Sequence, residues 1–124
     1  MTNIIAIVLC AILHVESSGG TNLQSGDDGR AVGPYQMWVC SVAEANRIEG
    51  IYSRRYERES RVWKSSDRSD LKKSTDMAEL ILIWHYRRGV TNAVELACRW
   101  NRPDGKASDR YRNKIKKILK TIRL

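Results

Sequence analysis

The chain has 124 residues, with 22 Lys and Arg against 14 Asp and Glu, so its formal net charge is +8. This length predicts one domain, residues 1–124, with one core that needs no metal or disulfide staple. The positive charge predicts attraction to anionic polymers such as nucleic acid, anionic lipid or bacterial wall material. The sequence has no C2H2 spacing, RNP-like aromatic motif or heptad repeat, which disfavours a dedicated nucleic-acid-binding module.

The three cysteines, Cys10, Cys40 and Cys98, are far apart and form no Cys-x-x-Cys pair. An odd and sparse set argues against a disulfide framework and fits a reducing compartment, with at most one bridge. Cys10 and Cys98 fall inside apolar helical patterns. We therefore expect both of these side chains to be small, buried and hydrophobic.

The first predicted element is a buried helix near the N-terminus. Its apolar residues, from Ile4 to Leu13, lie nearly all round a helix, and Gly19 and Gly20 end it. The run has no basic residue before it and no small-residue cleavage site after it, and it is too short to span a bilayer. We expect it to belong to the mature domain rather than to a signal peptide or a membrane anchor.

Residues 21–37 are rich in glycine and lack helical periodicity, which predicts a loop or a small β-hairpin that turns at Asp28-Gly29. A helix is predicted over 39–48. Residues 50–69 are predicted to be a partly helical, partly irregular surface region. The basic residues that we expect to be exposed there are Arg54, Arg55, Arg58 and Arg61.

Three further helices are predicted in the second half of the chain. Ser69 or Asp70 caps a long helix that ends at Gly89, Asn92 opens a short helix to about Trp100, and Ser108 caps the last helix. The apolar residues of the last helix expected to face the core are Ile115, Ile118, Leu119 and Ile122. The predicted class is mainly α (α+β), with at most one small β-hairpin beside the first helix.

The most informative motif places a carboxyl group at the end of the first helix. Glu16 follows an apolar helical run and is followed at once by Ser17-Ser18-Gly19-Gly20. A carboxyl group at an apolar helix end is desolvated, which raises its pKa and keeps its proton near neutral pH. This is the requirement for a general acid.

Three elements of the sequence, beginning with this motif, resemble the lysozyme-like superfamily. The residues Glu16 to Gly20, followed by Gly29-Arg-Ala-Val-Gly-Pro-Tyr-Gln-Met37, look like its catalytic segment, and are most similar to soluble lytic transglycosylases and to invertebrate-type and goose-type lysozymes. The run Ala97-Cys-Arg-Trp-Asn-Arg-Pro-Asp-Gly105, with a tyrosine shortly after, resembles the elements that close the other side of the cleft in that family. These elements cover most of the chain in the family's order.

The resemblance implies a lysozyme-like domain that cleaves the β-1,4 bond between N-acetylmuramic acid and N-acetylglucosamine in peptidoglycan. Glu16 would protonate the glycosidic oxygen and then act as a base. The residues expected to bind substrate are Ser17, Gly33, Tyr35, Gln36, Trp100, Asn101 and Tyr111. Arg102-Pro103 stands where the family usually has Gly-Gly, and this change stiffens the loop and adds charge beside the cleft.

Asp27 and Asp28 leave two mechanisms open. An Asp in this setting is commonly a turn former. As a second carboxylate, one of them would make the chain a hydrolytic muramidase, whose two carboxyl groups lie about 5 Å or about 6.5 to 9.5 Å apart. Lytic transglycosylases use one glutamate and let the substrate's own 6-hydroxyl attack. We favour the transglycosylase; the alternatives are the hydrolase or a non-catalytic glycan- or nucleic-acid-binding protein with the same fold.

The two histidines, His14 and His85, have no spacing typical of a metal site or a catalytic triad. We therefore predict no metal and no cofactor. The expected partner is bacterial peptidoglycan, bound by a monomer without membrane insertion. Without an export signal, the enzyme would stay in the host cytoplasm until lysis or travel with a virion, as a bacteriophage endolysin or virion-associated enzyme does.

Overall fold

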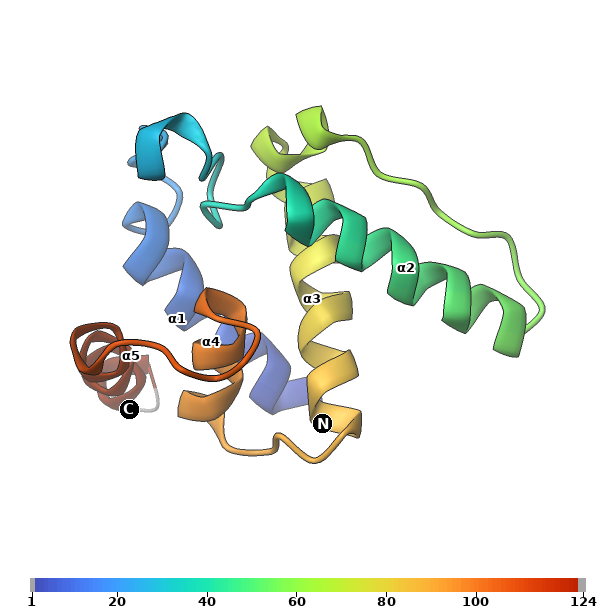
Figure 1. The fold of residues 1–124 in the computed structure, drawn as a ribbon. Helices are drawn as coiled ribbons and strands as arrows, with labels where there is room; N and C mark the ends of the chain where they lie inside the picture. The colour runs from blue at the N-terminus through green and yellow to red at the C-terminus, as the bar shows by residue number, and fades with distance from the viewer. Residues whose placement is uncertain (1, 123–124) are drawn as a thin grey trace.

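The structure is a computed structural model that describes the backbone of residues 2–122 and the side chains of residues 4–122. This part of the chain is mainly α, as predicted (Figure 1). Its helices are α1 (Thr2–Ser17), α2 (Val39–Arg55), α3 (Leu71–Arg87), α4 (Ala93–Asn101) and α5 (Asp109–Ile122), with two short 3-10 helices, η1 (Asp27–Gly29) and η2 (Ser65–Ser69).

The predicted caps of the last three helices are confirmed. Asp70 accepts a hydrogen bond from the backbone N–H of Lys73 at the start of α3, with a distance of 2.9 Å. Asn92 caps α4, and the Ser108 hydroxyl accepts from the backbone N–H of Tyr111 at 3.2 Å. Each cap satisfies an amide that the first helical turn leaves without a partner.

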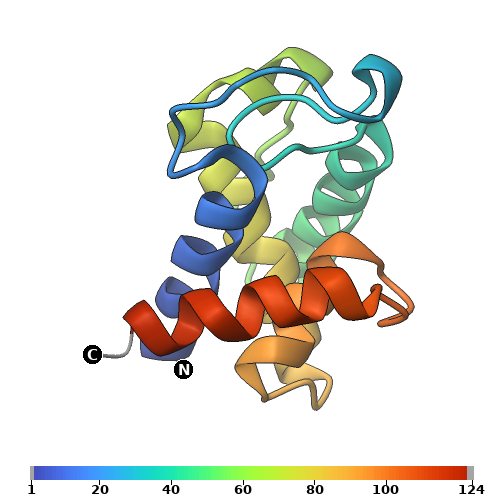
Figure 2. The ribbon, with the colours of Figure 1, turned by 90° about the vertical axis from the view of Figure 1, so that its left-hand side faces the viewer.

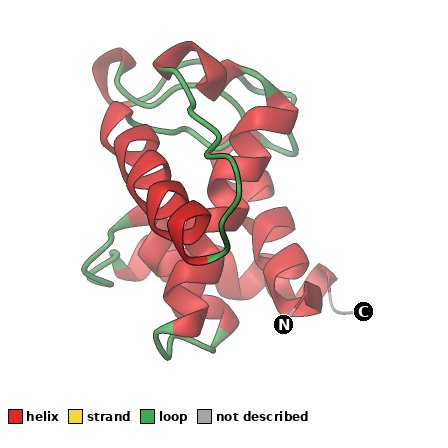
Figure 3. Ribbon diagram, turned by 90° about the vertical axis from the view of Figure 1, so that its right-hand side faces the viewer, coloured by secondary structure: helices red, strands yellow, loops and turns green. Residues whose placement is uncertain are grey.

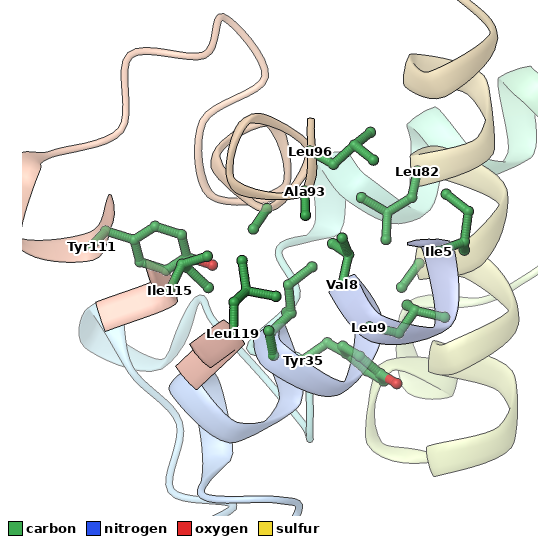
Figure 4. Close-up of a cluster of buried hydrophobic side chains, with 14 residues drawn as sticks. Ile5, Val8, Leu9, Tyr35, Leu82, Ala93, Leu96, Tyr111, Ile115 and Leu119 are labelled. Atoms are coloured by element: carbon green, nitrogen blue, oxygen red, sulfur yellow. The ribbon is translucent and has the colours of Figure 1, made fainter. Parts of the chain in front are cut away.

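Helix α1 lies against three other helices and forms the centre of the main core. It contacts α3, α4 and α5, and α5 lies across it (Figure 2). Ile5, Val8 and Leu9 of α1 meet buried side chains of the other helices (Figure 4). The labelled partners in this cluster include Leu82, Leu96, Ile115 and Leu119. Burial of these side chains removes apolar surface from water, which is the main force that holds α1 in place.

A second hydrophobic cluster joins α2 to α3 and to the segment before η2. Met37, Val42, Ile48, Tyr52 and Trp63 pack there against the side of α3. Trp100 of α4 packs against both clusters. Helix α3 therefore links two cores within one chain, and Trp100 lies where they meet.

Helix α1 is less completely buried than the sequence predicts. Ala6, Cys10 and His14 are exposed and repeat every four residues, so they form one solvent-facing stripe. The prediction that Cys10 is buried is therefore wrong, whereas Cys98 is buried as predicted. An apolar run alone does not show which face the neighbouring helices leave uncovered.

The glycine-rich segment forms a loop held by two isolated antiparallel bridges. Gly26 pairs with Ala31 and Val32 pairs with Met37. No strand forms within residues 2–122. The predicted turn at Asp28-Gly29 is the short helix η1, in which Asp27 and Asp28 have φ values of 52° and 57°. Figure 2 shows this loop at the end of the molecule where α1 ends.

Helix α2 continues seven residues beyond the predicted end at Ile48, and an irregular segment returns alongside it (Figure 3). The side chain of Glu49 on α2 is completely buried and pairs with Arg58 and Arg61 of that segment, at 2.7 Å each. Both arginines are exposed, as predicted, but each pairs with Glu49 and so holds the returning segment against the helix.

Candidate active site

A cleft of about 480 Å³ opens at the end of α1. Its walls come from the last turn of α1, the bridged loop, the start of α2 and the end of α4 with the loop that follows. The lining residues are Glu16, Gly26, Asp27, Ala31, Gln36, Trp38, Cys40, Ser41, Trp100, Asn101, Arg102 and Pro103. The structure thus brings together the three sequence elements that carry the resemblance.

Glu16 is the only lining residue whose acidity is strongly shifted. Its carboxyl group has a pKa of about 7, against the ordinary 4.5, mainly because the group is buried. The negative charge of Asp27 contributes to this rise in pKa, and the positive charge of Lys114 opposes it. Near neutral pH the carboxyl group is therefore divided between its protonated and ionised forms, so it can both donate and accept a proton.

Ser17 ends the helix that carries Glu16. Its hydroxyl donates to the backbone oxygen of Leu13 at 3.2 Å and accepts from the N–H of Gly20 at 3.0 Å. The side chain is 1% exposed and lies outside the cleft lining. The structure therefore does not bring Ser17 to a bound substrate; it places the residue where it fixes the helix end beside Glu16.

Gln36 lines the cleft, but its amide is engaged inside the loop. Its Oε1 accepts from the N–H of Gly26 at 2.9 Å, and its Nε2 donates to the carbonyl oxygens of Gln24 and Gly33, at 3.2 and 3.1 Å. These bonds join both bridges of the loop. Gln36 therefore shapes the wall of the cleft, and this role was not foreseen from the sequence.

Gly33 contacts the chain itself rather than the cleft. Its φ is +84°, and a Cβ atom added there would lie 1.9 Å from the carbonyl oxygen of Arg68. Only glycine tolerates both this conformation and this approach. The sequence predicts that Gly33 lies close to a sugar. In the structure it lies close to the backbone of η2 instead.

The aromatic residues divide between the cleft and the core. Tyr35 is 3% exposed, and its hydroxyl bonds to that of Thr75 at 2.9 Å, so it is a core residue. Trp100 lines the cleft, packs edge-to-face on Tyr35 and donates from its Nε1 to the Tyr35 carbonyl oxygen at 3.3 Å. The neighbouring Asn101 is exposed and lines the cleft.

Trp38 is a lining aromatic residue that sequence reasoning missed. It is exposed, and the guanidinium of Arg30 lies 5.7 Å from its ring centroid. It directly follows the recognised Gln36-Met37 motif, and that position was the available signal. An exposed indole ring is suited to pack on the face of a sugar ring.

Tyr111 lies among the core side chains and outside the cleft lining (Figure 4). It is 8% exposed, and its hydroxyl has no hydrogen-bond partner among the described residues. Burial raises its pKa far above the ordinary value, and the negative charge of Glu16 adds to this shift. Tyr111 is therefore a neutral core residue near Glu16 and is not placed to stack on a substrate.

The structure separates the two neighbouring aspartates. Asp27 lines the cleft and acts on the Glu16 carboxyl group through its charge. Asp28 is exposed and lies outside the lining. Of the two candidates for a second carboxylate, only Asp27 is positioned for that role.

Within the described residues, no group of three or more His, Cys, Asp and Glu side chains is arranged to hold a metal ion. None of the helices described is long and apolar enough to cross a membrane. No protein-family model matches the chain, and no curated protein or solved structure matches it either.

Proposed function

We propose that this protein is a glycosidase that cleaves the β-1,4 bond between N-acetylmuramic acid and N-acetylglucosamine in peptidoglycan. The observation that carries the proposal is Glu16, a carboxyl group with a pKa of about 7 in the wall of a cleft. The exposed ring of Trp38, the half-buried ring of Trp100 and the exposed amide of Asn101 suit a carbohydrate, whose rings present apolar faces and hydroxyl edges.

We propose the lytic transglycosylase reaction as the mechanism. Glu16 donates its proton to the glycosidic oxygen as the bond from that oxygen to C1 of N-acetylmuramic acid breaks. The carboxylate then takes the proton of the 6-hydroxyl of the same sugar, whose oxygen bonds to C1. The product carries a 1,6-anhydro ring, and Glu16 regains its proton without consuming water.

A second candidate, hydrolysis, is favoured by the presence of Asp27 in the cleft. An ionised Asp27 could serve as nucleophile or as the base that activates water. Sugar products with free reducing ends would then form. The two mechanisms share the same substrate and the same acid, so product chemistry separates them.

The variant Asp27→Asn tests this choice by mass spectrometry of the released fragments. For a transglycosylase, wild type and variant both release 1,6-anhydro products, and the rate changes only through the lowered pKa of Glu16. For a hydrolase, wild type releases reducing ends, and the variant loses about 10²-fold or more of its rate. Asp28→Asn is the matched control, because Asp28 is exposed outside the cleft and its loss is expected to leave the rate unchanged.

Cysteine alkylation provides a test of the cleft itself. Cys40 on α2 is exposed and lines the cleft, whereas Cys10 on α1 is exposed outside the cleft. Cys98 is buried, and this burial raises the pKa of its thiol. We expect N-ethylmaleimide to block most of the cleavage activity of the Cys10→Ser variant, because the adduct on Cys40 fills part of the cleft. The Cys10→Ser/Cys40→Ser protein should resist the reagent. Full activity of the Cys10→Ser protein after complete alkylation of Cys40 would show that substrate binds elsewhere.

A further inference from the structure

A second hollow of about 320 Å³ adjoins the cleft at Trp100. Cys40, Ser41, Trp100 and Pro103 line both spaces, so the two share a wall. The second hollow is further lined by Glu44, Ile81, His85 and Arg99. None of these four residues lines the space around Glu16.

Arg99 is held in a fixed position in this hollow. Its Nη1 donates to the carbonyl oxygen of Pro103 at 2.8 Å, and its guanidinium packs so closely on Gly105 that an added Cβ would lie 3.1 Å from Cζ. Its buried Nε has no hydrogen-bond partner among the described residues. A guanidinium that is fixed in place can bind a carboxylate without a large loss of side-chain entropy.

The other charges around the hollow leave it favourable for an anion. Glu44 pairs with Arg47, with oxygen–nitrogen distances of 2.6 and 3.0 Å, which offsets part of its negative charge. Burial lowers the pKa of the His85 imidazole, the positive charges of Arg99 and Arg88 lower it further, and the negative charge of Glu44 opposes the shift. His85 is therefore a neutral group that can donate or accept one hydrogen bond beside a positive guanidinium.

We propose that this second hollow binds the carboxylate-bearing peptide branch of the glycan strand. The proposal rests on the proposed function, because the branch is attached to the N-acetylmuramic acid unit that the main cleft would hold. A branch must leave the cleft beside its sugar, and the hollow that adjoins the cleft at Trp100 offers it space and a fixed cation. Arg99 is then a specificity-determining residue for peptide-bearing over bare glycan strands.

The test compares kcat/KM on peptide-bearing glycan strands with kcat/KM on strands stripped of their peptides by an amidase. We expect wild type to prefer the peptide-bearing strands by about tenfold, the usual effect of one hydrogen-bonded charge pair. Arg99→Gln should lose this preference, and the loss should fall on the peptide-bearing strands. Glu44→Gln should increase the preference, because it removes a carboxylate from the hollow and frees Arg47. Damage to the fold cannot produce these opposite changes.

Equal rates of wild type on both substrates, or an equal loss on both in Arg99→Gln, would overturn the inference while leaving the proposed function intact. Failure of wild type to cleave either substrate would instead contradict the proposed function.

A binding measurement on the Glu16→Gln protein gives a second readout. A soluble acidic stem peptide should shift the NMR signals of the His85 ring and leave those of His14 unchanged, and the same peptide with capped carboxylates should shift neither. Unchanged His85 signals at millimolar peptide would also reject the inference.

Discussion

Replacement of Glu16 by glutamine is expected to reduce the rate of glycan cleavage by at least about 10²- to 10⁴-fold. The amide keeps the size and most of the polarity of the carboxyl group but has no acidic proton to donate. Turbidity clearing of purified peptidoglycan provides the measurement. A variant that retained more than about a tenth of the wild-type rate would show that Glu16 is not the general acid.

The same substitution is expected to stabilise the protein at alkaline pH, which separates loss of chemistry from loss of fold. The pKa of Glu16 is about 7 in the folded protein, against 4.5 in its ordinary setting, so the folded state holds this proton more tightly. Wild-type stability should therefore decrease as the pH rises from about 4.5 to about 7, by roughly 3 kcal/mol. Glutamine does not ionise. Urea unfolding should show the variant more stable than wild type at pH 8 and nearly equal to it at pH 4.

The second large effect is expected when Glu49 loses both of its arginine partners. The Glu49 side chain is completely buried, while those of Arg58 and Arg61 are 40% and 51% exposed. The double variant Arg58→Gln/Arg61→Gln leaves a buried carboxylate without a counter-charge, which costs about 3 kcal/mol of unfolding free energy. This value lies at the lower end for a broken buried pair, because water reaches the arginine side.

The pH dependence provides a separate check on this pair. The Arg58 and Arg61 guanidinium groups lower the pKa of Glu49 to about 2. Their contribution to stability is therefore present above pH 4.5 and is lost as the pH falls towards 2, and the double variant should lack this acid-dependent loss. Lys72→Gln is the matched control. This variant breaks the ion pair between Lys72 and Asp76, in which the Lys72 side chain is 81% exposed. It should change the free energy of unfolding by less than about 1 kcal/mol. Equal effects of the two changes would contradict a buried role for Glu49.

Local sequence signals predicted much of the fold. Asp70, Asn92 and Ser108 each cap the helix that the pattern assigned to them, because a cap depends on residues within one turn. Glu16 was also found from a local pattern, a carboxyl group at the end of an apolar helix, and the structure adds the cleft and the raised pKa.

Features that depend on long-range contacts could not be predicted in this way. Gly33 packs against the backbone of Arg68, a residue 35 positions along the chain, and nothing in the local sequence identifies that neighbour. The pairing of Glu49 with Arg61 depends on the path of the irregular segment after α2. The resemblance pointed to Gln36 and Tyr35 as sugar contacts, but their polar groups have partners within the protein.

The two walls of the cleft differ in the way they are built, and this has a consequence for the ways the protein could vary. Glu16 stands on α1, whose side chains occupy the main core, so the acid can move only if much of the protein opens with it. The opposite wall is a loop held by two single bridges and one glutamine amide, with Tyr35 and Met37 buried in the cores. Substitutions at its exposed positions, such as Arg30, can reshape the mouth of the cleft at little cost to the rest of the molecule. The acid would keep its setting while the choice of bound polymer shifts.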